Sequence, residues 1–286
     1  MSPSLSTAYL LGLKLRFGDG PGTILRELRR PVRFAQRLVP IDYVRYREFE
    51  FTFDAINRFS KWQSLALDVS SPQLVPLTLG HVAGDRTIHA TNILQEEVDS
   101  TASAARELGI SGIVSEIQDV RALPYKDGMF DLVTSVSVVE HIAPEDRGEV
   151  PAIKEMARVL KPGGIAVLTV PYAHKRFSEF RAGTVYEREA TGTDETFFQR
   201  FYDHDQVMDN IVNPSGLELL ELSFIGERFF SRNPHKRMAH FINSTMLQNA
   251  IFGPWFPLIS RIFLTGARPV VQCVKPYIAC IVLRKN

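Results

Sequence analysis

The chain has 286 residues, 45% of them hydrophobic and 23% charged, a balance typical of a globular protein with one large core. Its formal net charge of +1 argues against a dedicated nucleic-acid binder, and we expect no nucleic-acid partner. The charge is uneven, however. Residues 1–47 carry nine Lys and Arg against three acidic residues, and residues 226–286 carry nine against one.

The cysteines and apolar runs indicate a compartment. Cys273 and Cys280 are the two cysteines, and because they lack metal-ligand spacing and make a poor disulfide framework, we predict no metal site and a reducing compartment. The apolar run at 9–13 has no preceding positive region, so no signal peptide is expected. The run at 241–264 is interrupted by Pro254 and Pro257 and is not expected to span a bilayer. A cytoplasmic location follows as the expectation.

Predicted elements begin with a basic helical leader over about 22–60, broken near Pro31 and Pro40. Apolar runs that end in polar residues then predict strands at 64–69, 87–92, 113–119 and 129–138. The fourth run is apolar on both faces, as in a central parallel strand. Helical spacing from Val150 to Leu160 predicts a helix, which a turn at 161–164 ends before a strand at 165–170.

Beyond residue 171 the alternation stops for about thirty residues, a length at which a loop is usually functional, and the aromatic content there predicts an ordered lid. Asp203 with Gln206 forms a capping pattern for a helix through Val212 that stops at 213–216. Strands are predicted at 217–224 and 277–283. The whole pattern predicts an α/β fold with a Rossmann-like, doubly wound, seven-stranded sheet over 61–286, interrupted by an insertion at about 229–275, with a helical N-terminal extension over 1–60.

Four motifs on this framework carry a family resemblance: residues 118–125 (QDVRALPY), 130–135 (FDLVTS), Glu140-His141 and 158–164 (RVLKPGG). This block resembles the class I S-adenosylmethionine-dependent methyltransferases, in particular the small-molecule group that includes the ubiquinone and menaquinone enzymes. The resemblance implies S-adenosylmethionine as cofactor and a small-molecule or lipid-like methyl acceptor.

The cofactor side departs from the family pattern. The family has an acid followed by a glycine-rich turn, which lets backbone N–H groups approach the methionine carboxylate. Here Asp68 supplies the acid, whereas Ser70, Pro72 and Leu74 replace the three glycines. The hydroxyls of Ser70 and Ser71 offer replacement donors. The alternative is that Asp68 only caps the following helix.

The other cofactor candidates lie at later strand ends, where an open α/β sheet binds ligands. Asn92 stands where the family has a ribose-binding acid, and an amide makes weaker bonds there than a carboxylate. Asp119 matches the family residue that accepts from the adenine amino group, and Val120 supplies the neighbouring N–H. Asp119 could instead be an ordinary turn residue. Ser135, near the end of the fourth strand, completes the predicted cofactor set.

Glu140 and His141 are the catalytic candidates. A neutral histidine can take a proton from an acceptor near pH 7, so His141 is the leading general base; the alternative is that the pair caps or packs the next loop. Lid side chains form the predicted acceptor pocket: Tyr172, His174, Arg200 and Tyr202.

The insertion combines an apolar stretch around Trp255 with flanking basic residues. This pattern suits an interfacial segment on an anionic membrane or a lid over a hydrophobic acceptor. We favour a third interpretation, a helical pair packed on the sheet edge. Two rival functions stay open: a degenerate methyltransferase fold that binds without turnover, and a peripheral membrane protein.

Overall fold

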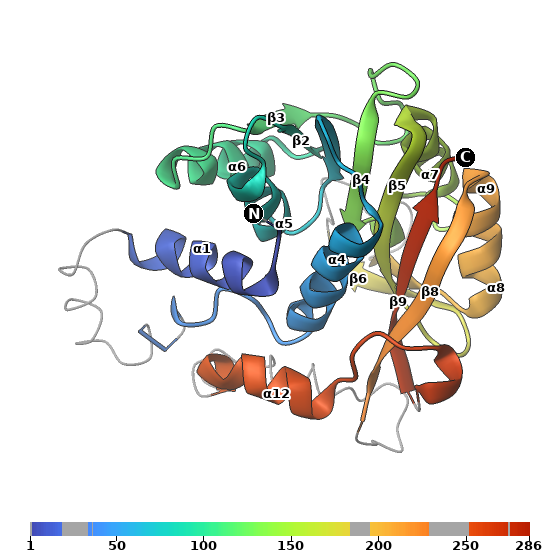
Figure 1. Cartoon of the computed structure of the whole chain (residues 1–286). Coiled ribbons are helices and arrows are strands. Elements are labelled where there is room, and N and C mark those ends of the chain that lie inside the picture. Colours follow the sequence, from blue (N-terminus) through green and yellow to red (C-terminus); the bar gives the residue numbers. More distant parts are fainter. Residues whose placement is uncertain (1, 19–33, 36, 184–194, 229–251, 274) are drawn as a thin grey trace.

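The computed structural model describes residues 2–18, 34–35, 37–183, 195–228, 252–273 and 275–286, and its centre is a seven-stranded sheet (Figure 1). The strands run in the order β3-β2-β1-β4-β5-β9-β8, and β9 is antiparallel to both of its neighbours. Their bounds are β1 Leu65–Val69, β2 Thr87–Asn92, β3 Ile113–Ile117, β4 Phe130–Val136, β5 Leu160–Pro171, β8 Glu218–Glu227 and β9 Lys275–Arg284. The predicted doubly wound α/β sheet is confirmed.

The predicted strands all form, and β2 has the predicted bounds. The other strands differ from their predicted bounds by one to five residues at an end, and the largest difference is at β5, which begins in the turn predicted at 161–164. The pairing of β4 with β5 shifts register between Phe130 and Leu132, and Gly163 adopts a φ of 76°. The chain therefore absorbs the Pro-Gly-Gly segment as an irregular strand start, because glycine tolerates the left-handed conformation.

Helices cover both faces of the sheet, and each face has its own apolar core. Their bounds are α1 Leu5–Phe17, α4 Arg45–Phe59, α5 Leu74–Val82, α6 Gln95–Glu107, α7 Val150–Val159, α8 His204–Gln206, η2 Val207–Val212, α9 Asn213–Ser215 and α12 Phe256–Phe263. One core joins α1, α4 and α5 to the sheet through residues such as Phe49 and Leu132. The other joins α7 and η2 to the opposite face through residues such as Met156 and Val133.

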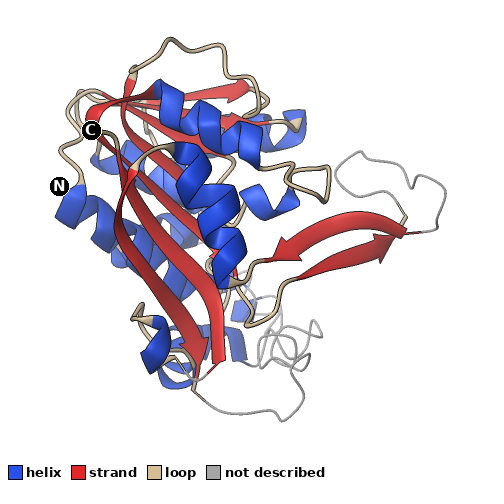
Figure 2. Ribbon diagram, turned by 90° about the vertical axis from the view of Figure 1, so that its right-hand side faces the viewer, coloured by secondary structure: helices blue, strands red, loops and turns tan. Residues whose placement is uncertain are grey.

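The aromatic segment after residue 171 contains a hairpin that the sequence did not predict. β6 (Phe177–Ala182) pairs antiparallel with β7 (Glu195–Phe201), and Figure 2 shows this pair projecting from the body of the molecule. Aromatic side chains pair across it, with Phe177 stacked on Phe201 at 4.4 Å between ring centroids. Such cross-strand aromatic pairs stabilise a hairpin that has no sheet neighbour.

The helix predicted after Asp203 forms with Asp203 as its cap, but among the described residues the Gln206 side-chain oxygen has no hydrogen-bond partner. The Asp203 carboxylate accepts from the backbone N–H of Gln206 at 3.0 Å. The helical segment continues through α9 and ends at Gly216 in the left-handed conformation, with φ 63°, so the predicted end at Val212 is three residues early. Left-handed glycine is a common helix terminator.

The N-terminal leader and the insertion lie partly outside the described residues. The chain is not helical at Pro40 and is helical again in α4, as predicted, whereas the predicted break at Pro31 lies outside the described residues. The insertion contributes α12, and its basic residues Arg232, Lys236 and Arg237 also lie outside them. Within the described chain, no helix is long and apolar enough to cross a bilayer.

Candidate active site

The turn that leaves β1 keeps a glycine-like backbone path without a glycine. Ser70 has a φ of 51°, in the left-handed region that favours glycine. Its backbone N–H and its hydroxyl both donate to the carbonyl of Thr91, at 2.8 and 3.1 Å. The turn is therefore fastened to the end of β2, and these two donors are used inside the protein.

Asp68 holds the same turn in place through hydrogen bonds. Its carboxylate is 1% exposed and accepts from the Ser71 N–H at 3.1 Å and from the Thr134 hydroxyl at 2.6 Å. Burial raises the pKa of this carboxyl to about 6, and the bonds from Thr134 and Ser71 oppose that rise. The Ser71 hydroxyl accepts from the Val136 N–H at 3.0 Å. Asp68 and Ser71 thus join the turn to β4, and the predicted use of the Ser70 and Ser71 hydroxyls as cofactor donors has no support from these contacts.

A small cavity of about 20 Å³ lies beneath the turn, lined by residues that include Asp68, Ser70, Asn92 and Thr101. That volume holds about one water molecule. The cavity is therefore too small to hold a nucleoside.

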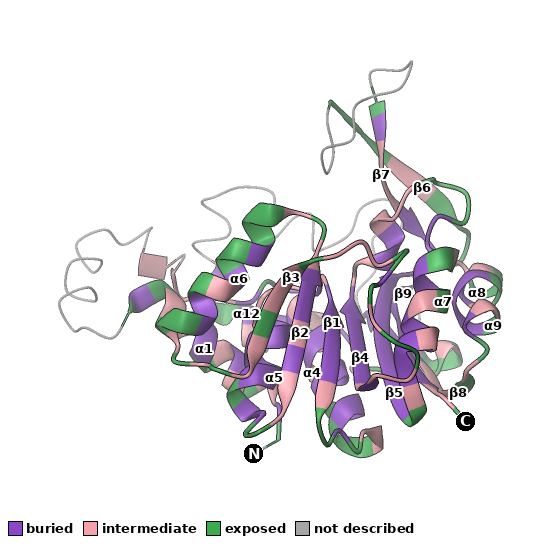
Figure 3. Ribbon diagram, turned by 90° about the horizontal axis from the view of Figure 1, so that it is seen from above, coloured by how far each residue is buried: buried purple, intermediate pink, exposed green. Residues whose placement is uncertain are grey.

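The exits of β2 and β3 lie beside this turn, as Figure 3 shows in the view from above. Asn92 is partly exposed, and its side-chain oxygen accepts from the Leu94 N–H at 3.0 Å. The Asp119 carboxylate is clasped by Arg121, with its oxygens 2.7–3.0 Å from the guanidinium nitrogens. These bonds lower the pKa of Asp119. Asp119 is 38% exposed, and Val120 is also partly exposed.

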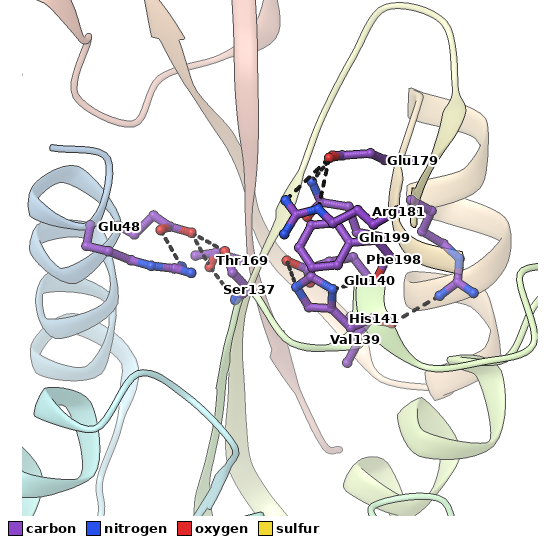
Figure 4. A network of polar contacts seen from close by, with 12 residues as sticks. Glu48, Ser137, Val139, Glu140, His141, Thr169, Glu179, Arg181, Phe198 and Gln199 are labelled. Carbon is purple, nitrogen blue, oxygen red and sulfur yellow. Dashed lines mark hydrogen bonds and ion pairs between the residues drawn. The ribbon is translucent and has the colours of Figure 1, made fainter. Parts of the chain in front are cut away.

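A buried polar cluster lies at the exits of β4 and β5, and its central residue comes from the N-terminal extension (Figure 4). Glu48 of α4 is 1% exposed. Its Oε1 accepts from the hydroxyls of Ser137, at 2.6 Å, and Thr169, at 2.9 Å. Its Oε2 accepts from the Arg45 guanidinium at 2.6 Å. Ser137 directly follows Val136, which bonds the Ser71 turn, so this cluster adjoins the candidate cofactor edge.

The sequence did not single out Glu48. A signal was present, because Glu48 shares a helical face with Thr52, Ala55 and Phe59, at offsets of four, seven and eleven residues. A charged residue among such neighbours indicates a buried carboxylate that needs partners.

Glu140 lies close to the same charges. It is 1% exposed, and within the described chain its Oε2 has no hydrogen-bond partner. Burial raises its pKa to about 8; Arg45 and Arg200 oppose the rise, and Glu48 adds to it. At neutral pH Glu140 is therefore mostly protonated and can act as a hydrogen-bond donor.

His141 is held in one tautomer. Its Nδ1 lies 2.8 Å from the carbonyl oxygen of Phe198, and its Nε2 lies 3.8 Å from Glu140 Oε1. A carbonyl only accepts, so Nδ1 carries the proton and Nε2 is the basic nitrogen of the neutral ring. The Phe198 ring lies against the imidazole, and the Arg181 guanidinium lies 3.3 Å from the centroid of that ring (Figure 4). The hairpin therefore orients this histidine.

Two of the predicted acceptor residues have internal roles instead. Arg200 is 2% exposed and pairs with Glu149 at 3.0 Å. It donates to the carbonyls of η1 (Val139–His141) and of the loop that follows, at Val139, Ile142 and Pro144. Tyr202 is fully buried. A guanidinium with this many internal partners supports the loop that carries Glu140 and His141, so we correct the prediction that Arg200 and Tyr202 contact an acceptor.

Of the other predicted residues, Tyr172 and Ser135 are buried and His174 is exposed. Tyr172 is 4% exposed and packs edge-on against Phe224, whereas His174 is exposed. Ser135 is 1% exposed inside β4, and among the described residues its hydroxyl has no hydrogen-bond partner. The structure thus brings Asp68, the Ser70 turn, Asn92 and the β4 exit to one edge, and it buries Tyr172 and Ser135 beneath that edge.

Comparison with known families agrees with this arrangement. Residues 67–168 match a family model described as a methyltransferase domain. The match begins in β1 and ends within β5, so it includes the exits of β1, β2, β3 and β4, whereas the exit of β5 lies just beyond it. The match shows that this segment is similar to methyltransferase domains, and the seven-stranded sheet around it agrees with that likeness.

Individual relatives are more distant. The chain is 36% identical over 104 residues to norajmaline N-methyltransferase of Rauvolfia serpentina, a match that covers 35% of this chain and 34% of that protein. It is 29% identical over 122 residues to a ubiquinone/menaquinone biosynthesis C-methyltransferase of Shewanella, covering 38% and 47%. The matches thus span less than two thirds of these relatives.

The fold has counterparts among solved structures. An S-adenosylmethionine-dependent methyltransferase of Clostridium acetobutylicum superposes with a TM-score of 0.50 at 12% identity, covering 93% of this chain and 97% of that one. At this identity the likeness concerns the fold alone.

The residues present fit S-adenosylmethionine at this edge. The observation is the Ser70 turn, whose left-handed backbone supplies without glycine the sharp reversal that the family's glycine-rich turn provides. Pro72 removes one N–H donor, so the fit at the methionine end relies on fewer donors than the family pattern has.

Proposed function

We propose that this protein transfers the methyl group of S-adenosylmethionine to a small-molecule acceptor whose nucleophile lies beside His141. The observation that carries the proposal is the left-handed Ser70 turn at the exit of β1, within the segment that matches the methyltransferase family. When bound, the cofactor supplies an electrophilic methyl group on a sulfonium.

Each strand exit has a part in the proposed cofactor site. Asp119 and Val120 would hold the adenine, Asn92 the ribose, and the turn that follows Asp68 the methionine end. Asp119 must share its carboxylate between Arg121 and the adenine amino group, because the guanidinium already occupies both oxygens.

The acceptor side would use Glu140 and His141. The Phe198 carbonyl fixes the tautomer, so His141 Nε2 would accept a proton as the acceptor nucleophile attacks the methyl group. Glu140 is 1% exposed and lies 3.8 Å from His141 Nε2, so its part would be to hold His141 in place from inside the protein. Most of the rate enhancement would come from holding the two reactants in line.

The similarity to an N-methyltransferase and a C-methyltransferase supports a small organic acceptor. A lipid-like acceptor is the finer form of the proposal. It is favoured by the exposed apolar residues Trp255, Leu258 and Ile262 in and beside α12.

Calorimetric titration of the full chain with S-adenosylmethionine tests the first half of the proposal. Methyl transfer from radiolabelled cofactor to a panel of phenols, amines and prenylated quinols tests the second. Saturable binding with transfer to one class of acceptor is the expected result. Binding without transfer across the panel would favour the non-catalytic alternative, and absence of heat at millimolar cofactor would refute the proposal.

A further inference from the structure

α12 and the residue before it expose an apolar stripe that the protein core does not use. Trp255, Leu258 and Ile262 are 61%, 55% and 44% exposed. Their spacing of three and four residues places them on one side of the helix. The opposite side is already buried, since Phe256 is fully buried and packs against Tyr43 of the N-terminal segment. The exposed stripe therefore takes no part in packing α12 against the core.

The surroundings of the stripe are basic. Arg261 is 66% exposed, and its guanidinium lies 3.9 Å from Glu50. The same carboxylate also accepts from Arg47 at 2.5 Å, and Arg47 donates to the carbonyls of Arg261 and Leu264. Two arginines thus share one acid and leave a net positive charge beside the stripe. From residue 252 to the last residue the sequence carries Arg and Lys but no Asp or Glu.

The position of α12 relates it to the candidate active site. Its C-terminal end is fastened to the end of β8: the Arg228 N–H donates to the Phe263 carbonyl and the Thr265 N–H to the Gly226 carbonyl, both at 2.8 Å. β8 is antiparallel to β9, which is antiparallel to β5. β8 therefore ends at the same edge of the sheet as β4 and β5, where Glu48 and Ser137 lie. In Figure 1, α12 lies at this edge beside α4.

We propose that α12 and Trp255 dock this edge of the protein on an anionic lipid surface. An exposed tryptophan with aliphatic neighbours enters the headgroup boundary of a bilayer, and adjacent arginines meet the anionic lipids. This arrangement needs no membrane-spanning helix. It orients the strand exits toward the bilayer, so that an amphiphilic acceptor would reach the site from the lipid. The docking itself does not depend on turnover.

Co-sedimentation of the full chain with vesicles tests the proposal. We expect binding to vesicles of phosphatidylcholine with phosphatidylserine, weaker binding to phosphatidylcholine alone, and loss of binding as salt rises. Leu258→Ser should weaken binding about tenfold or more, because it removes an inserted apolar side chain. Arg261→Gln should weaken it about fivefold. The matched control is Val114→Ser, which changes an exposed apolar residue of β3 that is 40% exposed and should bind like the wild type.

Tryptophan quenching locates the contact. The chain has two tryptophans, and Trp62 is buried at 7% exposure. Vesicles with brominated acyl chains should quench the fluorescence of the wild type, and Trp255→Phe should abolish most of that quenching while it preserves binding.

Several results would overturn the docking. These are no binding to phosphatidylserine vesicles at low salt, wild-type binding by a Leu258→Ser variant with an unchanged melting temperature, or a dimer in sedimentation velocity that Leu258→Ser dissociates. The last result would assign the stripe to a second copy of the chain. Calorimetry with S-adenosylmethionine on the same preparations separates this failure from failure of the proposed function, because cofactor binding does not require α12.

Discussion

The two halves of the sheet edge are built in different ways. In the cofactor half, the exits of β1, β2 and β3 are tied together by short contacts: Ser70 donates to the carbonyl of Thr91, and the Gln118 N–H donates to the carbonyl of Asn92. In the acceptor half, Glu48, Ser137, His141 and the hairpin come from segments up to about 150 residues apart and meet only in the folded protein. The cofactor half therefore depends on contacts between neighbouring strand ends, whereas the acceptor half depends on contacts between distant segments of the chain.

The largest expected effect comes from removing the proposed general base of the acceptor half. His141→Ala should lower turnover by about 10²–10⁴, because a positioned general base contributes that much, while cofactor affinity in the intact half stays unchanged. Single-turnover rates with an identified acceptor provide the measurement. His81→Ala is the control, since that histidine is exposed on α5 and lies outside the proposed site. A normal rate in a folded His141→Ala variant would leave positioning as the whole mechanism.

The second prediction concerns Glu48, the residue through which the N-terminal extension contributes to the acceptor half. Glu48→Ala leaves the half-buried Arg45 without its closest acid and two hydroxyls without an acceptor, so the free energy of unfolding should fall by about 3 kcal/mol. Glu50→Ala, two residues along α4, changes a carboxylate that is 40% exposed and should cost less than about 1 kcal/mol. Urea denaturation of both variants measures the difference. Equal losses would show that α4 depends on packing alone.

The pH dependence of stability distinguishes Glu140 from its surroundings. Its folded pKa of about 8 lies above the ordinary value of 4.5, so the folded state holds a proton that the unfolded chain releases. This contribution to stability is complete below pH 4.5 and is lost as the pH rises through 8. Glu140→Gln should remove a fall in unfolding free energy on the order of 3 kcal/mol between these values.

Glu155→Gln is the control for that experiment. The pKa of Glu155 is lowered by Arg158, so its contribution is lost only as the pH falls below its ordinary range. For the Glu155→Gln variant, the slope of unfolding free energy against pH between 5 and 8 should match that of the wild type. A Glu140→Gln variant with the wild-type slope would mean that another group takes up the proton.

The sequence predicted the strands and the helix start at Asp203 well because the information for them is local. Strand periodicity, the polar residues at strand ends and the capping pattern at Asp203 each depend on a few neighbours, and each is found in the structure. The β6–β7 hairpin was missed because Phe177 and Phe201 are paired by tertiary contact and not by a recognisable turn. Glu48 was missed for a related reason: its partners Ser137 and Thr169 lie 89 and 121 residues away. Arg200 was assigned to the acceptor because sequence alone does not reveal that five backbone-carbonyl contacts already occupy its guanidinium.

The fourth prediction tests the cofactor half at β3. Asp119→Ala should weaken S-adenosylmethionine binding by about 1–3 kcal/mol, because the adenine amino group loses its acceptor. Asp127→Ala is matched, since Asp127 is also exposed and also pairs with an arginine, Arg158, at 2.7 Å, but lies outside the proposed site. Calorimetry of both variants gives the comparison. If Asp119 only orders its turn, affinity will be preserved and the melting temperature will fall.

The smallest expected effect comes from a substitution in the Ser70 turn of the cofactor half. Ser70→Gly removes a Cβ from a residue with φ 51°, which relieves about 1 kcal/mol of left-handed strain. It also removes the hydroxyl bond to Thr91 and adds freedom to the unfolded chain, which together cost a similar amount. The free energy of unfolding should therefore change by less than about 0.5 kcal/mol. Cofactor affinity should rise about two- to fivefold, because a turn without the Cβ lets the ligand approach its backbone more closely.

Ser71→Gly provides the contrast: it leaves the buried Val136 N–H without an acceptor and should lose about 1–3 kcal/mol of stability. Weaker binding by Ser70→Gly at unchanged stability would show that the Ser70 hydroxyl serves the cofactor, and that the bond to Thr91 is exchanged when the cofactor binds.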